Sequence, residues 1–270
     1  MNRSMTDCEI LEAQPTFGKP LETDGCTRTS FYHHYHSAKC DARSKLYDWS
    51  VLTERFQLIA SRRREDRAYF YRHGATKYNL TNRVSGQHDT LLSELGRKQA
   101  SALRESLPNR IDMIVCSTLF RTVETMTIGV PPHVRNHAPV VVDPRLNEVH
   151  LGILQGKRRR HLSGYEQGDL DFAPDQGESY RMAAQRVLSL IADLFDDLAA
   201  TRSRPRTAVV FAHAGIMRII STLVTGNDER DLFKTNHANT ECLALPAERM
   251  HLPDYWNRTS HASGIKCHSF

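Results

Sequence analysis

Two histidines stand at corresponding places in the sequence, each directly after a short apolar run. His73 follows the run that ends near Tyr71, and His213 follows the run Val209-Val210-Phe211. An imidazole can serve as a nucleophile or exchange protons near neutral pH. A single histidine in such a position is more often structural, so the polar groups around the pair decide what chemistry it can perform.

Charged side chains follow the same apolar runs and their neighbours. Arg72 directly precedes the first histidine, Arg121 lies shortly after the second run, and Glu148 follows the third. Two guanidinium groups can bind a tetrahedral dianion in a bidentate manner, and two imidazoles can add donors or a nucleophile. We therefore predict a phosphate site without a metal ion or another cofactor. The alternative, surface ion pairs, is the usual fate of arginine but does not explain why these residues recur after strands.

The carboxyl edge of a sheet would bring these distant residues together. From residue 66, short apolar runs alternate with longer segments of helical periodicity, a pattern typical of a largely parallel sheet with covering helices. The expected strands are 68–71, 111–116, 140–142, 207–212 and 241–245, and helices are expected within 92–107, 180–198 and 215–223. We predict an α/β fold, a three-layer α/β/α sandwich with a mainly parallel central sheet and its site at the carboxyl ends of the strands.

Composition and charge narrow the classes of partner. The net charge is +5, from 36 basic and 31 acidic residues spread along the chain, so binding to nucleic acid is not expected. Neither a signal-peptide pattern nor an apolar run near the roughly 20 residues of a membrane span occurs, so no membrane association is expected. The six cysteines form no C-x-x-C pair, which favours a reducing cytoplasm. A monomer and a homodimer both fit these data.

The motifs, taken in order, resemble those of the histidine phosphatase superfamily, also called phosphoglycerate-mutase-like proteins. The resemblance runs from about residue 66 to 245. It rests on Arg72-His73-Gly74 with Thr76, Tyr78 and Asn79, on 89–96 and 117–125, on Leu146-Asn147-Glu148 with Gly152 and Gly156, on Gly177-Glu178-Ser179 with Arg186, and on Ala212-His213-Ala214-Gly215. Each motif is short, but their common order is specific to the family.

The resemblance implies a role for each of the charged residues. His73 would attack phosphorus and form a phosphohistidine, which splits hydrolysis into two easier steps. Arg72, Arg121 and His213 would bind the phosphoryl oxygens, where charge gathers in the transition state. Glu148 would protonate the leaving alkoxide and later accept a proton from water.

Two further groups are predicted to bind the substrate. The resemblance places Asn79 where it would add a hydrogen bond to the phosphate or to the rest of the substrate. The segment 156–161 lies where family members keep substrate-covering elements, and it contains Arg158, Arg159 and Arg160. We predict that these arginines bind a second anionic group of the substrate. The alternative is a solvated loop or a nonspecific anion patch.

The sequence departs from the family pattern in ways that bear on activity. Ala75 stands where relatives usually have Glu or Gln, so it removes a polar side chain from the expected pocket mouth and alters substrate preference or rate. Mutases usually have an arginine after their glutamate, where this chain has Val149, and they carry a long insertion. We predict hydrolysis of a small phosphorylated metabolite. The alternatives are a mutase-type phosphotransferase or a catalytically weak module that binds a phospholigand or protein.

The domain organisation follows from where the family pattern begins and ends. Residues 1–64 are expected to form an N-terminal extension, with a helix within 45–60 that docks on the main domain. Residues 65–246 are expected to form the histidine phosphatase catalytic domain, and 247–270 a C-terminal tail. The cluster His33-His34-Tyr35-His36 with Cys40 matches no tetrahedral zinc pattern, so no metal site is predicted there.

Overall fold

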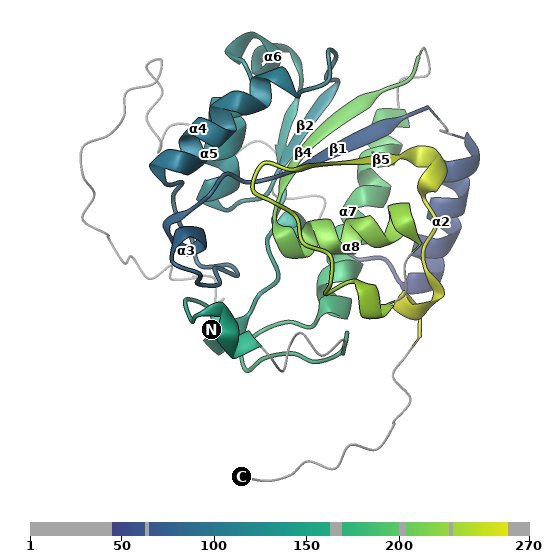
Figure 1. The fold of residues 1–270 in the computed structure, drawn as a ribbon. Coiled ribbons are helices and arrows are strands. Elements are labelled where there is room, and N and C mark those ends of the chain that lie inside the picture. The colour runs from purple at the N-terminus through teal and green to yellow at the C-terminus, as the bar shows by residue number, and fades with distance from the viewer. Residues whose placement is uncertain (1–44, 63–64, 163–168, 200–203, 227–228, 259–270) are drawn as a thin grey trace, which may run out of the picture. The chain divides into compact units, whose positions relative to one another are not determined.

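A five-stranded sheet forms the centre of the computed structural model (Figure 1). The structure describes residues 45–62, 65–162, 169–199, 204–226 and 229–258. All of these belong to one unit, Lys39–Phe270, whereas the second unit, Met1–Ala38, lies outside the described residues. The histidine cluster at 33–36 and the end of the predicted C-terminal tail also lie outside them.

The strands lie in the order β3-β2-β4-β1-β5. Their bounds are Arg67–Arg72 for β1, Met113–Cys116 for β2, Val140–Val142 for β3, Thr207–Ala212 for β4 and Cys242–Pro246 for β5. Strands β1 to β4 are parallel to their neighbours, while β5 is antiparallel to β1. The predicted α/β fold with a mainly parallel sheet is confirmed.

Helices cover the sheet on both faces (Figure 1). The α-helices are α2 Trp49–Arg62, α3 Lys77–Leu80, α4 Glu94–Ala102, α5 Phe120–Gly129, α6 Pro132–His137, α7 Tyr180–Ala199 and α8 Ala214–Thr225. Short 3-10 helices are η1 Leu103–Glu105, η2 Pro144–Leu146, η3 Gly152–Leu154, η4 Arg159–Leu162, η5 Glu229–Asp231, η6 Ala247–Arg249 and η7 Asp254–Trp256. None of the helices in the described ranges is long and apolar enough to cross a membrane.

The side chains on the two faces of the sheet pack in different layers of the core. The reason is that successive residues of a strand point to opposite faces. Phe70 and Val210 belong to the large buried cluster that also holds the apolar stripes of α7 and α8. Their chain neighbours Tyr71 and Phe211 stack at a ring-centroid distance of 5.9 Å. Both strands therefore have buried residues on both faces, and polar side chains gather only where the strands end.

Some strands and helices begin or end at other residues than the apolar pattern predicts. The strand expected from residue 111 begins at Met113, because the carboxylate of Asp112 accepts a hydrogen bond from the Thr207 N–H at 3.0 Å and pairs with Arg204 and Arg206. The helical segment expected within 92–107 changes to 3-10 geometry after Ala102.

The helix expected in the extension is present as α2 and packs on the main part of the chain. Leu52, Phe56 and Ile59 are buried in the same cluster as the residues of α7. Trp49 at its start stacks on Trp256 with ring centroids 6.2 Å apart. The helix thus shares the main core, and the domain boundary at residue 64 stays a prediction.

Candidate active site

His73 lies at the carboxyl end of β1, with its ring enclosed by protein. The residue is buried, and its Nδ1 lies 2.7 Å from the carbonyl oxygen of Gly74. Because a carbonyl oxygen only accepts, Nδ1 carries the proton. Burial lowers the pKa of His73 well below its usual value, and the charges of Arg121 and Arg72 lower it further. The ring is therefore neutral near pH 7, with its lone pair on Nε2.

Hydrogen bonds from the start of α4 fix the backbone of the segment that follows His73. The carbonyl oxygen of Ala75 accepts hydrogen bonds from the N–H and the hydroxyl of Ser93, each at 2.8 Å, and Ser93 caps α4. A Cβ at Gly96 would lie 2.0 Å from this same carbonyl oxygen. Only glycine fits at that position, so the motif 89–96 fixes the path of the chain beside the nucleophile candidate.

His213 ends β4, the strand next to β1, and its ring centroid is 5.3 Å from that of His73. Its Nε2 lies 2.7 Å from Ser117 Oγ, which lies 2.6 Å from Thr122 Oγ1. Thr122 gives its single hydroxyl proton to the Leu119 carbonyl at 2.6 Å. The 2.6 Å contact with Thr122 then takes the single Ser117 hydroxyl proton, so Ser117 Oγ accepts from Nε2 of His213. Because burial lowers the pKa of His213, its ring is neutral, and this arrangement places its one proton on Nε2.

Arg72 and Arg121 bring two guanidinium groups to the histidine pair. Nη1 of Arg72 donates to the carbonyl of His237 at 2.5 Å. Arg121, on the first turn of α5, donates to the carbonyls of His88 at 2.9 Å and Gly86 at 2.7 Å. Burial lowers the pKa of both arginines to about 10, so both keep their charge at neutral pH. Hydrogen bonds to neutral backbone carbonyls do not neutralise the guanidinium charges, so both charges can act on a bound anion.

Buried donors around the histidines lack a hydrogen-bond partner among the described residues. They are Nε of Arg72 and Nε of Arg121, and the ring nitrogen Nδ1 of His213 is likewise buried without a partner. An unpaired buried donor costs about 1–3 kcal/mol, so each needs an explanation. A phosphoryl group supplies several acceptor oxygens and fits this set. Within the same residues, no cluster of three or more His, Cys, Asp or Glu could hold a metal.

Glu148 approaches the donors from the segment after β3. Its carboxylate accepts hydrogen bonds from the N–H groups of Val149 at 2.9 Å and Gly215 at 3.2 Å. A Cβ at Gly215 would lie 2.5 Å from Oε1 of Glu148, so a larger residue there would displace the carboxylate. Its charge acts on both Arg72 and Arg121. Glu148 is thus placed to exchange a proton with a group held by these arginines.

Asn79 and Ala75 lie on the segment that follows the first histidine. The side-chain oxygen of Asn79 accepts a hydrogen bond from the N–H of Thr76 at 3.0 Å, within the capping box of α3. Its amide nitrogen is the part of the side chain that could donate to a substrate. Ala75 is buried, with its N–H bonded to Gln99 at 2.9 Å, and its predicted place at the pocket mouth stays a prediction.

The three arginines at 158–160 are exposed and differ in their surroundings. Arg158 forms an isolated bridge with Arg83, while Arg159 begins η4 and donates its N–H to the Asn82 carbonyl at 3.0 Å. The charge of Arg159 adds to the effect of burial in lowering the pKa of Arg72. The charge of Arg159 therefore acts on Arg72, a residue of the candidate site.

Residues just before β5 support the site, and the sequence did not single them out. Asn239 donates from its side chain to the His73 carbonyl at 2.9 Å. His237, whose carbonyl binds Arg72, is buried and pairs through Nδ1 with Glu241 at 2.8 Å. Their place next to the site follows from the antiparallel pairing of β5 with β1, for which no local sequence signal exists.

The comparisons with known proteins bear on this arrangement. The model of the histidine phosphatase superfamily (branch 1) matches residues 68–252. The chain belongs to the histidine phosphatase superfamily. The predicted family is thereby confirmed, and so is the expectation that the protein is a phosphatase.

Relatives within this superfamily include several phosphatases. The glucosyl-3-phosphoglycerate phosphatase of Mycolicibacterium vanbaalenii is 37% identical over 171 residues, which cover 59% of this chain and 74% of that protein. The metal-independent phosphoserine phosphatase of Arabidopsis thaliana is 28% identical over 207 residues, covering 72% and 82%. The solved mycobacterial glucosyl-3-phosphoglycerate phosphatase with inorganic phosphate matches with a TM-score of 0.56 and 30% identity, covering 66% and 88%.

Proposed function

We propose that this phosphatase hydrolyses phosphate monoesters in two steps through a phosphohistidine on His73. The geometry of the His73 ring carries the proposal. Its Nδ1 proton is engaged by the Gly74 carbonyl at 2.7 Å, and burial keeps the ring neutral by lowering its pKa. The Nε2 lone pair of a neutral ring is the nucleophile that such a reaction requires.

In the first step, Nε2 of His73 attacks phosphorus in line with the bond to the leaving group. The P–N bond forms as the P–O bond breaks, and Glu148 gives its proton to the departing oxygen. The guanidinium groups of Arg72 and Arg121 stabilise the phosphoryl oxygens, and so does His213 once Ser117 turns its hydroxyl toward Nε2 and the ring proton lies on Nδ1. These groups lower the activation barrier because they stabilise the charge of the transition state more than that of the bound substrate.

In the second step, water attacks the phosphohistidine. Glu148 accepts a proton from the water, the P–N bond breaks, and its electron pair returns to Nε2 of His73. The products are inorganic phosphate and an alcohol, and the enzyme returns to its starting state. One carboxylate thus serves both steps, as proton donor and then as proton acceptor.

The substrate class that we propose is a small phosphorylated metabolite with a second anionic group. The exposed Arg159 supports this, because its charge already acts on Arg72 beside the phosphate site. Two of the relatives are named for phosphoglycerate and phosphoserine compounds, each of which has a carboxylate besides its phosphate. The buried Val149 after Glu148 supplies no positive charge for a mutase-type exchange. The cytoplasmic location and the monomeric or dimeric state stay predictions.

Stereochemistry at phosphorus tests the two-step route. A chiral phosphate ester should be hydrolysed with retention of configuration, because each in-line displacement inverts phosphorus once. Rapid quenching should also trap acid-labile, base-stable phosphate on the wild-type protein and none on His73→Asn, which should lack turnover of p-nitrophenyl phosphate. Inversion of configuration would refute the phosphohistidine, since it requires direct attack by water. Turnover by His73→Asn at the wild-type rate would also refute it.

A further inference from the structure

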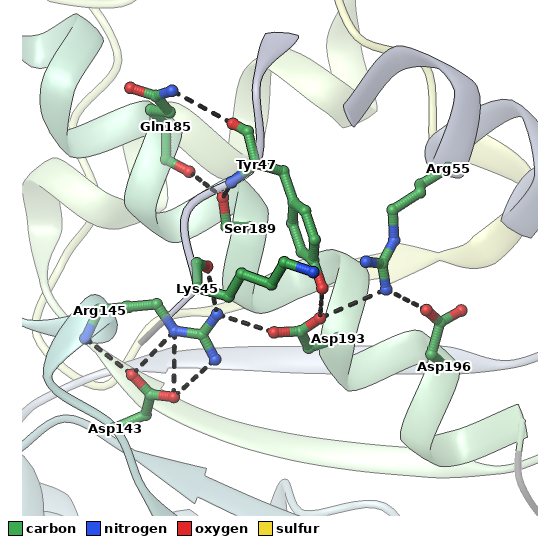
Figure 2. Close-up of polar contacts among 9 residues, drawn as sticks. All are labelled: Lys45, Tyr47, Arg55, Asp143, Arg145, Gln185, Ser189, Asp193 and Asp196. Carbon is green, nitrogen blue, oxygen red and sulfur yellow. Dashed lines mark hydrogen bonds and ion pairs between the residues drawn. The ribbon is translucent and has the colours of Figure 1, made fainter. Parts of the chain in front are cut away.

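The segment before α2 is fixed against α7 by polar contacts that converge on Tyr47 (Figure 2). The Tyr47 hydroxyl donates to Asp193 Oδ1 at 2.7 Å. Its N–H donates to Ser189 Oγ at 3.0 Å, and its carbonyl accepts from Gln185 Nε2 at 3.2 Å. The guanidinium of Arg55 lies 4.1 Å from the centre of the tyrosine ring, a cation–π contact. Both backbone and side chain of Tyr47 are therefore held by α7.

Arg145 in η2 joins the same network from the catalytic part of the chain (Figure 2). This buried arginine donates from Nη1 to Asp193 Oδ2 at 2.8 Å and to the Lys45 carbonyl at 3.1 Å. Its Nη2 donates to Asp143 at 2.9 Å. One carboxylate thus connects two elements, because Asp193 accepts from Tyr47 through Oδ1 and from Arg145 through Oδ2.

The segment that Arg145 begins leads directly to Glu148. Arg186, also on α7, donates to the carbonyls of Arg145 and Asn147 at 2.7 Å each and to that of Glu148 at 3.2 Å. The backbone of this segment is therefore attached to α7 by Arg186, while the Arg145 side chain is attached to α7 and to residue 45 through Asp193. A shift of Arg145 would be transmitted over three residues to the carboxylate that faces the phosphate site.

We propose that residues 45–47 act, through Asp193 and Arg145, as a clasp that positions the carboxylate of Glu148. The inference rests on the proposed role of Glu148 as proton donor. The family model begins at residue 68, so this clasp comes from the part of the chain that precedes the matched domain. Tyr47, Asp193 and Arg145 are positioning residues. They tune how well Glu148 protonates the leaving group, because proton transfer depends steeply on geometry.

A comparison of two aspartates on α7 tests the clasp. Asp193→Asn weakens the bonds to Tyr47 and Arg145, whereas Asp196→Asn is the matched control. Asp196 pairs with Arg55, and among the described residues Asp196 makes no hydrogen bond or ion pair with Arg145. We expect Asp193→Asn to lower kcat for an alkyl monophosphate about tenfold and kcat for p-nitrophenyl phosphate less than about twofold. The reason is that p-nitrophenolate is a weak base and needs little help from a proton donor.

A milder variant keeps the test valid if Asp193→Asn folds poorly. Tyr47→Phe removes only the hydroxyl and keeps the aromatic ring beside Arg55. It should lower kcat for the alkyl monophosphate about threefold with a smaller effect on p-nitrophenyl phosphate. Thermal unfolding would show that each variant is folded. Equal losses on both substrates, or the same selective loss in Asp196→Asn, would overturn the clasp.

Glu148→Gln separates the clasp from the proposed function. If Glu148→Gln loses alkyl monophosphate turnover selectively, the proton-donor role holds, and Asp193→Asn alone decides the clasp. If Glu148→Gln loses both substrates equally, the donor role fails and the clasp fails with it. In the double variant Glu148→Gln with Asp193→Asn, the aspartate change should add no further selective loss. An additional selective loss would overturn the coupling through Glu148.

Discussion

Acid should destabilise this phosphatase because His73 and His213 are buried as neutral rings. Burial lowers the pKa of each histidine well below the ordinary value of 6.5. The unfolded chain therefore binds more protons than the folded protein once the pH falls below 6.5. The free energy of unfolding is at its full value above this pH and decreases as the pH falls.

The size of the effect follows from proton linkage. At pH 5.5, one pH unit below the unfolded-state pKa of 6.5, each histidine costs up to about 1.4 kcal/mol, and the pair up to about 2.8 kcal/mol. A loss of this size is a large fraction of the stability of a typical domain, which is about 5–15 kcal/mol. It should therefore be measurable by equilibrium unfolding.

Urea unfolding at pH 7.5 and pH 5.5 provides the assay. The double variant His73→Asn with His213→Gln keeps amide groups that can hydrogen-bond to Gly74 and Ser117 but removes both titrating rings. The wild type should lose up to about 2.8 kcal/mol more than this variant between the two pH values. His133→Gln, at an exposed position on α6, is the control and should behave as the wild type. Equal pH dependence of the wild type and the double variant would refute the reasoning.

Two further substitutions address the substrate and the proton donor. Arg159→Ala should raise KM about fivefold for a phosphorylated substrate that also has a carboxylate, and not for p-nitrophenyl phosphate, because one charge contact is lost. Steady-state kinetics with Arg160→Ala as control would check this, and equal effects on both substrates would contradict it. Gly215→Ala places a Cβ 2.5 Å from Oε1 of Glu148 and should lower kcat for alkyl monophosphates about tenfold. An unchanged kcat would show that the carboxylate tolerates the displacement.

The local pattern of apolar residues was sufficient to predict the strands and helices that carry the candidate site. The strands at 140–142 and 207–212 have the bounds expected from their apolar runs, and α7 covers the expected stripe. The reason is that burial on one or both faces imposes a period that is visible in the sequence. Asp112 marks the limit of this approach. Its carboxylate delays the start of the strand to Met113 by binding the Thr207 N–H, a partner far away along the chain.

The residues predicted for the site were chosen from order, spacing and the family resemblance, and their roles stay predictions. Arg72 and His73 are adjacent in the chain, so one strand end must place both. Ala75, by contrast, is buried beside Gly96, which its residue type does not reveal. The chain turns inward there because Ser93 binds its carbonyl, and a contact of that kind follows from packing rather than from a motif.

The amino-acid order of this chain was enough to predict a phosphate site, because guanidinium, imidazole and carboxylate groups follow the apolar strands. The three-dimensional arrangement added the partners that lie far apart in sequence. The strand order β3-β2-β4-β1-β5 places His73 beside His213, and Asp193 joins Tyr47 to Arg145. Such contacts depend on which strands pair and which helix faces meet. Long-range packing sets both, and no periodicity within a segment encodes them.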